Sequence, residues 1–160
     1  MAIREIQVQR FNVTSSKSFE DVVGRIDGAI GHPDMKELLR APTYSDLERA
    51  ISKLVGPSGL MEFTRFDLGA ILRLERGTKV PKILRLVVGN PLIMKRMVEH
   101  VPDAGSYAPV TILIDEREDG VHVSYDRVAT LLASYGNAEA LAVARDLDSK
   151  VESLLTAATS

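Results

Sequence analysis

The 160-residue sequence contains no cysteine. This absence excludes disulfides, thiolate nucleophiles, zinc sites with sulfur ligands and iron–sulfur clusters, because all of them need a thiol or thiolate. A chain without disulfides fits a reducing compartment. The sequence also lacks an apolar run of the roughly 20 residues that span a bilayer, and its first residues lack the apolar core of a secretory signal. We therefore expect a soluble cytoplasmic protein.

The chain has no excess of charge of either sign. It carries 20 basic and 22 acidic residues, for a formal net charge of -2. The strongly basic face that nucleic acid binding requires is missing, and the polar side of the last expected helix is not basic, so we expect neither nucleic acid nor membrane as a partner. The acid-rich residues 115–119 are interpreted as a solvated hairpin tip. A hard-metal site there is the alternative, and it would need further oxygen ligands from elsewhere.

Apolar residues make up 45% of the chain and charged residues 26%, which is typical of a globular protein. The length fits one domain over residues 1–160, and a domain of this size buries enough surface to be stable alone. The three histidines are dispersed, and none has the spacing of a metal-binding pair, so we expect no metal site.

Periodicity in the first half predicts a strand, a helix, a helical insert and a second strand region. The first strand is expected near residues 6–13, and Ser18 begins a helix that ends at Gly31. Residues 32–58 form the insert, with a capping box at Ser45 and Glu48. Residues 60–76 change phase, which indicates a bulge, two strands with a bend, or a short helix over residues 68–74.

The second half predicts three further strands, the last two joined by a hairpin, with helices around them. Strands are expected over residues 82–88, 109–116 and 121–125, with the hairpin turn at Asp119-Gly120. The helices are expected to start at three capping residues: Asn90, Asp126 and Asn137. Together the pattern predicts an α+β fold with a mixed or antiparallel sheet of about five strands, helices packed on one face, and the helical insert.

Several of these motifs resemble one family, which is known as domain of unknown function 302. The resemblance lies in residues 87–91 (Val-Val-Gly-Asn-Pro), the proline-led strand 108–114, the strand 120–125 that ends in Ser-Tyr, residues 18–20 (Ser-Phe-Glu) and Phe66-Asp67. It covers roughly residues 5–30 and 60–156. The resemblance implies a small α+β fold that forms a dimer in at least some members, and it implies no established activity. We therefore expect a homodimer.

The sequence departs from that family's pattern at two places. Many members carry a histidine directly after the aspartate, and Leu68 stands at this position here. Any chemistry of that histidine is absent from this chain. The segment 32–58 is longer than the family's usual connection, and it could reshape a pocket or add a dimer surface.

Residues 89–91 (Gly89, Asn90 and Pro91) are the first candidate site. A strand ends and a helix begins there, so free backbone N–H groups and the positive end of the helix dipole could hold a carboxylate or a phosphate. The alternative is that Asn90 caps the helix and Pro91 starts it, without any ligand. No phosphate-loop pattern follows.

Tyr125 and Asp67 are the other two candidates. Tyr125 ends a half-buried strand and could place a phenol at a cleft as a donor or weak acid, or it could be a buried aromatic with a backbone partner. Asp67 follows Phe66 in an apolar stretch and could act as a base with a raised pKa, or it could cap a turn.

Three functions follow, in this order. The first is a small-molecule-binding homodimer whose ligand is apolar or anionic and contacts Gly89, Asn90, Pro91, Tyr125 and Asp67. The second is a structural or protein-interaction module, which predicts an exposed apolar patch on the insert. The third is an enzyme that uses Asp67 and Tyr125 as acid and base, which requires the two side chains to converge on one cleft. The sequence indicates no cofactor.

Overall fold

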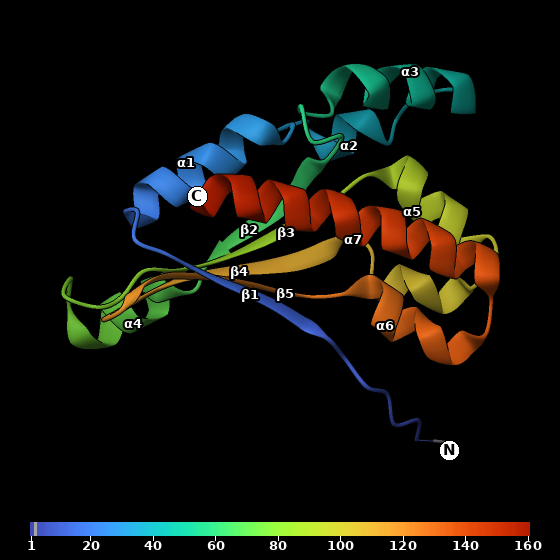
Figure 1. The fold of residues 1–160 in the computed structure, drawn as a ribbon. Helices are drawn as coiled ribbons and strands as arrows, with labels where there is room; N and C mark the ends of the chain where they lie inside the picture. The colour runs from blue at the N-terminus through green and yellow to red at the C-terminus, as the bar shows by residue number, and fades with distance from the viewer. Residues whose placement is uncertain (2) are drawn as a thin grey trace.

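Alternating apolar and polar residues form the five strands of one antiparallel sheet. A computed structural model describes residue 1 and residues 3–160 (Figure 1). The sheet has the order β1-β5-β4-β3-β2, and every neighbouring pair is antiparallel. The expected sheet is therefore confirmed. The strands are β1 (Arg10–Ser15), β2 (Met61–Asp67), β3 (Ile83–Gly89), β4 (Val110–Arg117) and β5 (Gly120–Asp126).

The long helices cover one face of this sheet. Figure 1 shows α7, in red, lying across the sheet between α1 and α5. Helix α4 lies at the left-hand ends of the strands, away from α5 and α6. The helices are α1 (Phe19–Ala29), α2 (Met35–Leu38), α3 (Tyr44–Leu54), α4 (Gly69–Arg76), α5 (Pro91–Val98), α6 (Val128–Leu132) and α7 (Ala138–Thr159), with short 3-10 helices η1 (Pro102–Ser106) and η2 (Ala133–Tyr135).

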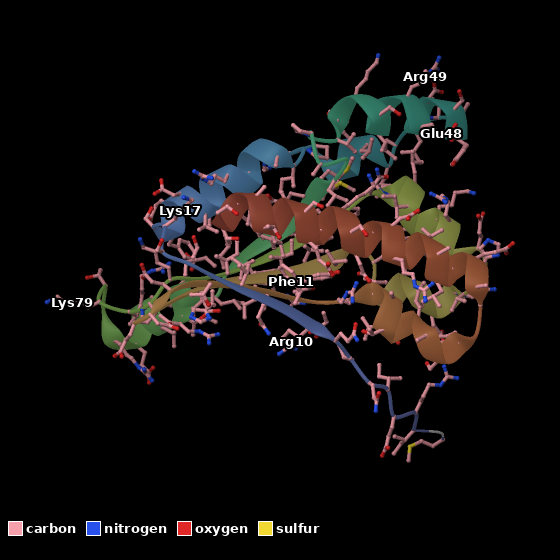
Figure 2. The ribbon with its side chains drawn as sticks, in the orientation of Figure 1. Arg10, Phe11, Lys17, Glu48, Arg49 and Lys79 are labelled. Atoms are coloured by element: carbon pink, nitrogen blue, oxygen red, sulfur yellow. The ribbon has the colours of Figure 1, made fainter. Side chains whose placement is uncertain are left out.

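The two faces of the sheet differ in what covers them. Leu86, Ile112 and Val123 point toward the helices and are fully buried. Successive side chains of a strand point to opposite faces, so the residues between them form the other face, which no helix layer covers among residues 1 and 3–160 (Figure 1). We call this the open face. In β1, for example, Phe11 points toward the helices and Arg10 away from them (Figure 2).

Helix starts follow short-range capping chemistry in most cases. The side chains of Ser18 and Asn137 accept hydrogen bonds from backbone N–H groups three residues ahead, as expected. The capping box expected at Ser45 is wrong. The N-cap of α3 is Thr43, whose hydroxyl accepts from the Asp46 N–H, because the helix starts two residues earlier.

Segment 32–58 folds into α2 and α3, which share a small core of their own with β2. Glycines hold this unit to the sheet. The Gly31 N–H donates to Leu60 O, the Glu62 N–H donates to Gly31 O, and the Gly56 N–H donates to Leu60 O. A side chain at Gly31 would overlap the backbone of Leu54, so only glycine fits this junction.

Residues 60–76 combine two of the expected alternatives. β2 has a register shift between Glu62 and Thr64, which is the expected bulge. The chain then turns into α4, so the short-helix reading of residues 68–74 is confirmed. Among the residues that the structure describes, no helix is both long and apolar enough to cross a membrane.

Candidate functional site

The side chain of Asn90 makes two hydrogen bonds within the protein. Its Oδ1 accepts from the Leu92 N–H at 2.9 Å, and its Nδ2 donates to Gly59 O at 3.0 Å. The side chain therefore caps α5 and ties it to the turn before β2. Gly89 lies against Pro109, where a Cβ would come within 3.0 Å of the proline ring. Pro91 is buried at the first helical position. This arrangement matches the capping alternative for residues 89–91.

Asp67 is exposed at the end of β2 and serves as a turn cap. Its Oδ1 accepts from the Ala70 N–H at 3.0 Å, and its Oδ2 pairs with Arg73. The Arg73 guanidinium holds the pKa of Asp67 below its usual value. A carboxylate with a lowered pKa is a weaker base, which is the opposite of the change that a catalytic base needs.

Tyr125 is buried under α7 and donates to a buried carboxylate. Its ring is 2% exposed, and its hydroxyl donates to Asp148 Oδ1 at 2.6 Å. Burial, reinforced by Asp148, raises the pKa of Tyr125 well above its ordinary value. The phenol therefore remains a protonated donor at neutral pH. Its hydrogen bond is to a side chain, rather than to the backbone partner expected for a buried tyrosine.

Asp148 is the acceptor at the centre of this buried network. It is 0% exposed, and besides the phenol it accepts from the Val128 N–H at 2.8 Å and the Ala129 N–H at 3.0 Å. It therefore caps α6 from a position 20 residues downstream. The sequence interpretation that Asp126 caps this helix is wrong, because the Asp126 carboxylate accepts instead from Arg10 at 2.6 and 2.9 Å.

The two residues of the acid–base hypothesis are not brought together. Asp67 lies on β2 and Tyr125 on β5, with β3 and β4 between them. At about 4.8 Å per strand, the two backbones are about 14 Å apart across the sheet. One side chain is in solvent beside Arg73, and the other is enclosed under α7.

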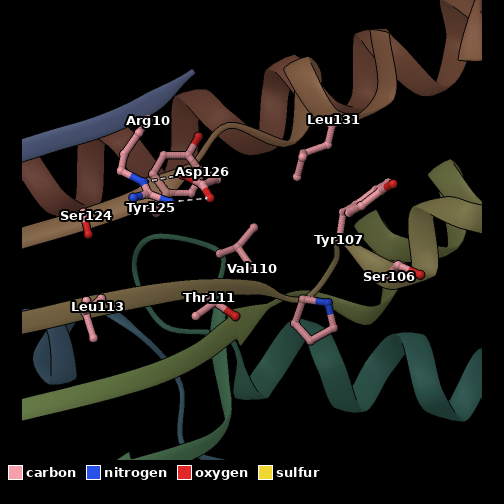
Figure 3. A pocket seen from close by; sticks show the side chains of 11 residues that line it. Arg10, Ser106, Tyr107, Val110, Thr111, Leu113, Ser124, Tyr125, Asp126 and Leu131 are labelled. Carbon is pink, nitrogen blue, oxygen red and sulfur yellow. Dashed lines mark hydrogen bonds and ion pairs between the residues drawn. The ribbon is translucent and has the colours of Figure 1, made fainter. Parts of the chain in front are cut away.

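A concave site lies where the open face meets the loop before β4. This open-face cavity has a volume of about 300 Å³ (Figure 3). The strands contribute Thr111, Leu113 and Ser124, and the wall beside them is formed by Tyr107 and Leu131. Of the five predicted site residues only Tyr125 reaches the lining.

Polar and apolar groups share this lining. Thr111 and Ser124 offer hydroxyl groups, and neither hydroxyl has a hydrogen-bond partner among the described residues. The Arg10–Asp126 ion pair borders the cavity at one side (Figure 3). Tyr107 is fixed by a 3.3 Å contact between its hydroxyl and that of Tyr135, and this contact raises the pKa of Tyr135 to about 12. The Tyr135 phenol therefore remains protonated at neutral pH.

Asp27, His32 and Glu62 place three possible metal ligands within 4.8 Å of one another. The Arg65 guanidinium already binds this cluster. It donates to Asp27 at 2.7 Å and pairs with Glu62, whose pKa it lowers. An internal cation thus pairs with both carboxylates, and the cluster links α1 to β2.

The largest exposed apolar side chains lie mainly outside the insert. Ile71 and Leu74 on α4 are 71% and 90% exposed, against 66% for Leu39 and 50% for Tyr44 in the insert. The interaction hypothesis placed such a patch on residues 32–58. The structure shows the more exposed apolar side chains on α4.

The chain belongs to the family described as "Domain of unknown function DUF302", whose model matches residues 39–158. No curated protein matches the chain. The fold also resembles a crystal structure titled as an uncharacterized conserved DUF302 protein from Bacillus stearothermophilus, with a TM-score of 0.66 and 12% sequence identity. That comparison covers 94% of this chain and 98% of the other, so most of segment 32–58 has a structural counterpart there.

Proposed function

We propose that the protein is a homodimer that binds a small, mainly apolar molecule in the open-face cavity. The observation that carries this proposal is the cavity itself. It is concave, its volume of about 300 Å³ is at the lower end of the roughly 300–1,000 Å³ of small-molecule sites, and apolar side chains share its lining with hydroxyl groups and one ion pair. The homodimer is proposed from what the family resemblance implies and from the exposed edge of the sheet at β1.

The lining favours a neutral ligand over an anionic one. Arg10 is the cation at the cavity, and it already makes two charged hydrogen bonds to Asp126. An anion would have to share that guanidinium and approach the Asp126 carboxylate, which repels it. The free hydroxyls of Thr111 and Ser124 instead suit a neutral molecule with one or two hydrogen-bonding groups.

The buried network behind the cavity gives this site a rigid wall. Tyr125 lines the cavity while its hydroxyl is held by Asp148, which also fixes the start of α6. Leu131, on α6, forms the opposite wall. Tyr125 therefore supports the site as a positioning residue, and the proposal assigns it no proton transfer.

Filling the cavity is expected to abolish binding while the fold stays intact. Thr111→Phe places a large ring in the site. Thr111 is exposed, and both threonine and phenylalanine favour strands, so we expect the variant to fold. We expect indole, a small neutral probe, to cause saturable changes in the amide NMR signals of Thr111 and Ser124 in the wild type. In the variant we expect an affinity at least about tenfold lower, which corresponds to about 1.4 kcal/mol.

Thr64→Phe is the matched control. Thr64 is also an exposed threonine on the open face, but it lies on β2, outside the cavity. This variant should bind indole as the wild type does. Benzoate tests the anionic alternative, and we expect it to bind more weakly than indole. Equal loss of binding in both variants, or no saturable change in the wild type, would contradict the proposed site.

A further inference from the structure

The exposed edge of the sheet at β1 indicates how the homodimer is built. We propose that two copies of this chain pair antiparallel through β1, so that their sheets become one continuous sheet. This inference rests on the homodimer part of the proposed function, and it names the surface and the partner. The partner is a second copy of the same strand.

The backbone of β1 presents unpaired hydrogen-bonding groups at this edge. The Arg127 N–H donates to Gln9 O at 2.9 Å, which makes residues 9 and 127 a hydrogen-bonded pair in the β1–β5 register. Hydrogen-bonded and non-hydrogen-bonded pairs alternate in an antiparallel ladder. The N–H and C=O groups of Arg10, Asn12 and Thr14 therefore point away from β5, and they have no partner among the described residues.

This edge lacks the features that usually prevent strand pairing. Exposed edges are protected by proline, bulges, inward-facing charges or a covering segment. β1 pairs with β5 without a register shift and contains no proline, and its one charged side chain, Arg10, is held by Asp126. The opposite edge differs, since Gly31 forms a bridge to Met61 and accepts from the Glu62 N–H at the start of β2.

One register satisfies all three outward positions of β1. Outward residues must face outward residues, so pairing Asn12 with the partner's Asn12 sets Arg10 opposite the partner's Thr14. This register exchanges about six hydrogen bonds across the interface, two for each pair. A shift that pairs Arg10 with the partner's Arg10 would place like charges directly opposite each other, which is unfavourable.

The segment before β1 extends this contact. Residues 3–9 continue beyond β1 past α6 and η2, where the Gln9 N–H donates to the Thr130 hydroxyl and the Arg4 guanidinium lies over the Tyr135 ring (Figure 1). Ile6 and Val8 remain 37% and 42% exposed there. In the proposed register Val8 lies opposite the partner's Ser16, so the segment runs along the residues that follow the partner's β1. It adds apolar contact to an interface that would otherwise consist mainly of backbone hydrogen bonds.

Asn12→Pro tests the pairing by removing an outward N–H that the single chain does not use. Proline is tolerated on an edge strand when its nitrogen faces solvent. We expect the dimer dissociation constant, measured by analytical ultracentrifugation, to rise about 10- to 100-fold from the two hydrogen bonds lost per dimer. Asn12→Ala keeps the N–H, so its dissociation constant should stay within about threefold of the wild-type value, because exposed substitutions usually change stability by under about 0.5 kcal/mol.

Single cysteines locate the interface directly, since the chain has none of its own. In the proposed register the two Asn12 Cα atoms lie about 5.5 Å apart, within the range of a disulfide. Asn12→Cys should therefore form a covalent dimer under mild oxidation. Thr111→Cys should not, because strand spacing places the two copies of Thr111 about 24 Å apart.

The outcomes separate the interface from the proposed function. A wild type that stays monomeric would overturn both the homodimer and this interface. A dimer that resists Asn12→Pro, or that cross-links through Thr111→Cys instead of Asn12→Cys, would overturn the β1 interface alone. Loss of the dimer in Asn12→Pro with indole binding retained would support the interface and leave the cavity assignment standing.

Discussion

Replacing Asp148 by alanine is expected to lower the free energy of unfolding by about 3–5 kcal/mol, because three donors lose their acceptor. The donors are the Tyr125 hydroxyl and the N–H groups of Val128 and Ala129. Asp148 is fully buried, so water cannot replace the carboxylate without opening the packing of α7. Urea unfolding followed by circular dichroism measures this change.

Tyr125→Phe is the control for this network. It removes one of the three donors and leaves both backbone N–H groups capped, so a loss of only about 1 kcal/mol is expected. The difference between the two losses of stability shows whether the Asp148 carboxylate stabilises the protein mainly through the Tyr125 hydroxyl or through the N–H groups at the start of α6. A loss below about 1 kcal/mol for Asp148→Ala, smaller than a single typical hydrogen bond, would contradict the structural role assigned to it.

Gly31→Ala is expected to destabilise the protein by about 3 kcal/mol, the upper range for forced overpacking. A Cβ at this position would lie 1.7 Å from Leu54 O and 2.8 Å from Leu54 C, and both are backbone atoms that belong to α3. The backbone must therefore move. That movement strains the hydrogen bonds that Gly31 makes with Leu60 and Glu62. We expect this strain to appear as faster hydrogen exchange at the N–H groups of residues 31 and 62, together with a lower urea midpoint.

Gly28→Ala is the matched substitution in the same part of the chain. A Cβ at Gly28 meets nothing within 4 Å, and the residue lies inside α1. Alanine should therefore stabilise the protein by about 0.5–1 kcal/mol through helix propensity. If both glycine variants change stability alike, the steric reason given for Gly31 is wrong.

The fold was largely predictable because its signals are local. The apolar run in residues 82–88 predicted β3, the alternation in residues 121–125 predicted the half-buried strand β5, and Asn137 marked the start of α7. Residues 60–76 were ambiguous, since a short apolar run fits a strand or a helix equally well. The structure assigns them to both, with β2 followed by α4.

The site was less predictable because tertiary contacts create it. Asp148 is 23 residues from Tyr125 along the chain, and nothing local marks a charged residue of an amphipathic helix as the buried cap of another helix. The cavity joins residues from the loop before β4, from the three strands β1, β4 and β5, and from α6. A binding site was predicted at Gly89, Asn90 and Pro91 because a helix starts there. The helix does start there, but the Asn90 side chain itself caps it by accepting from the Leu92 N–H.

Native mass spectrometry of the purified protein with increasing indole tests the central claim most directly. The account predicts a species of twice the chain mass that gains up to two indole molecules, one for each open-face cavity. It also predicts that Thr111→Phe forms the same dimer without the added mass. A wild-type protein that remains a monomer and gains no mass at any indole concentration would contradict both the homodimer and the binding function.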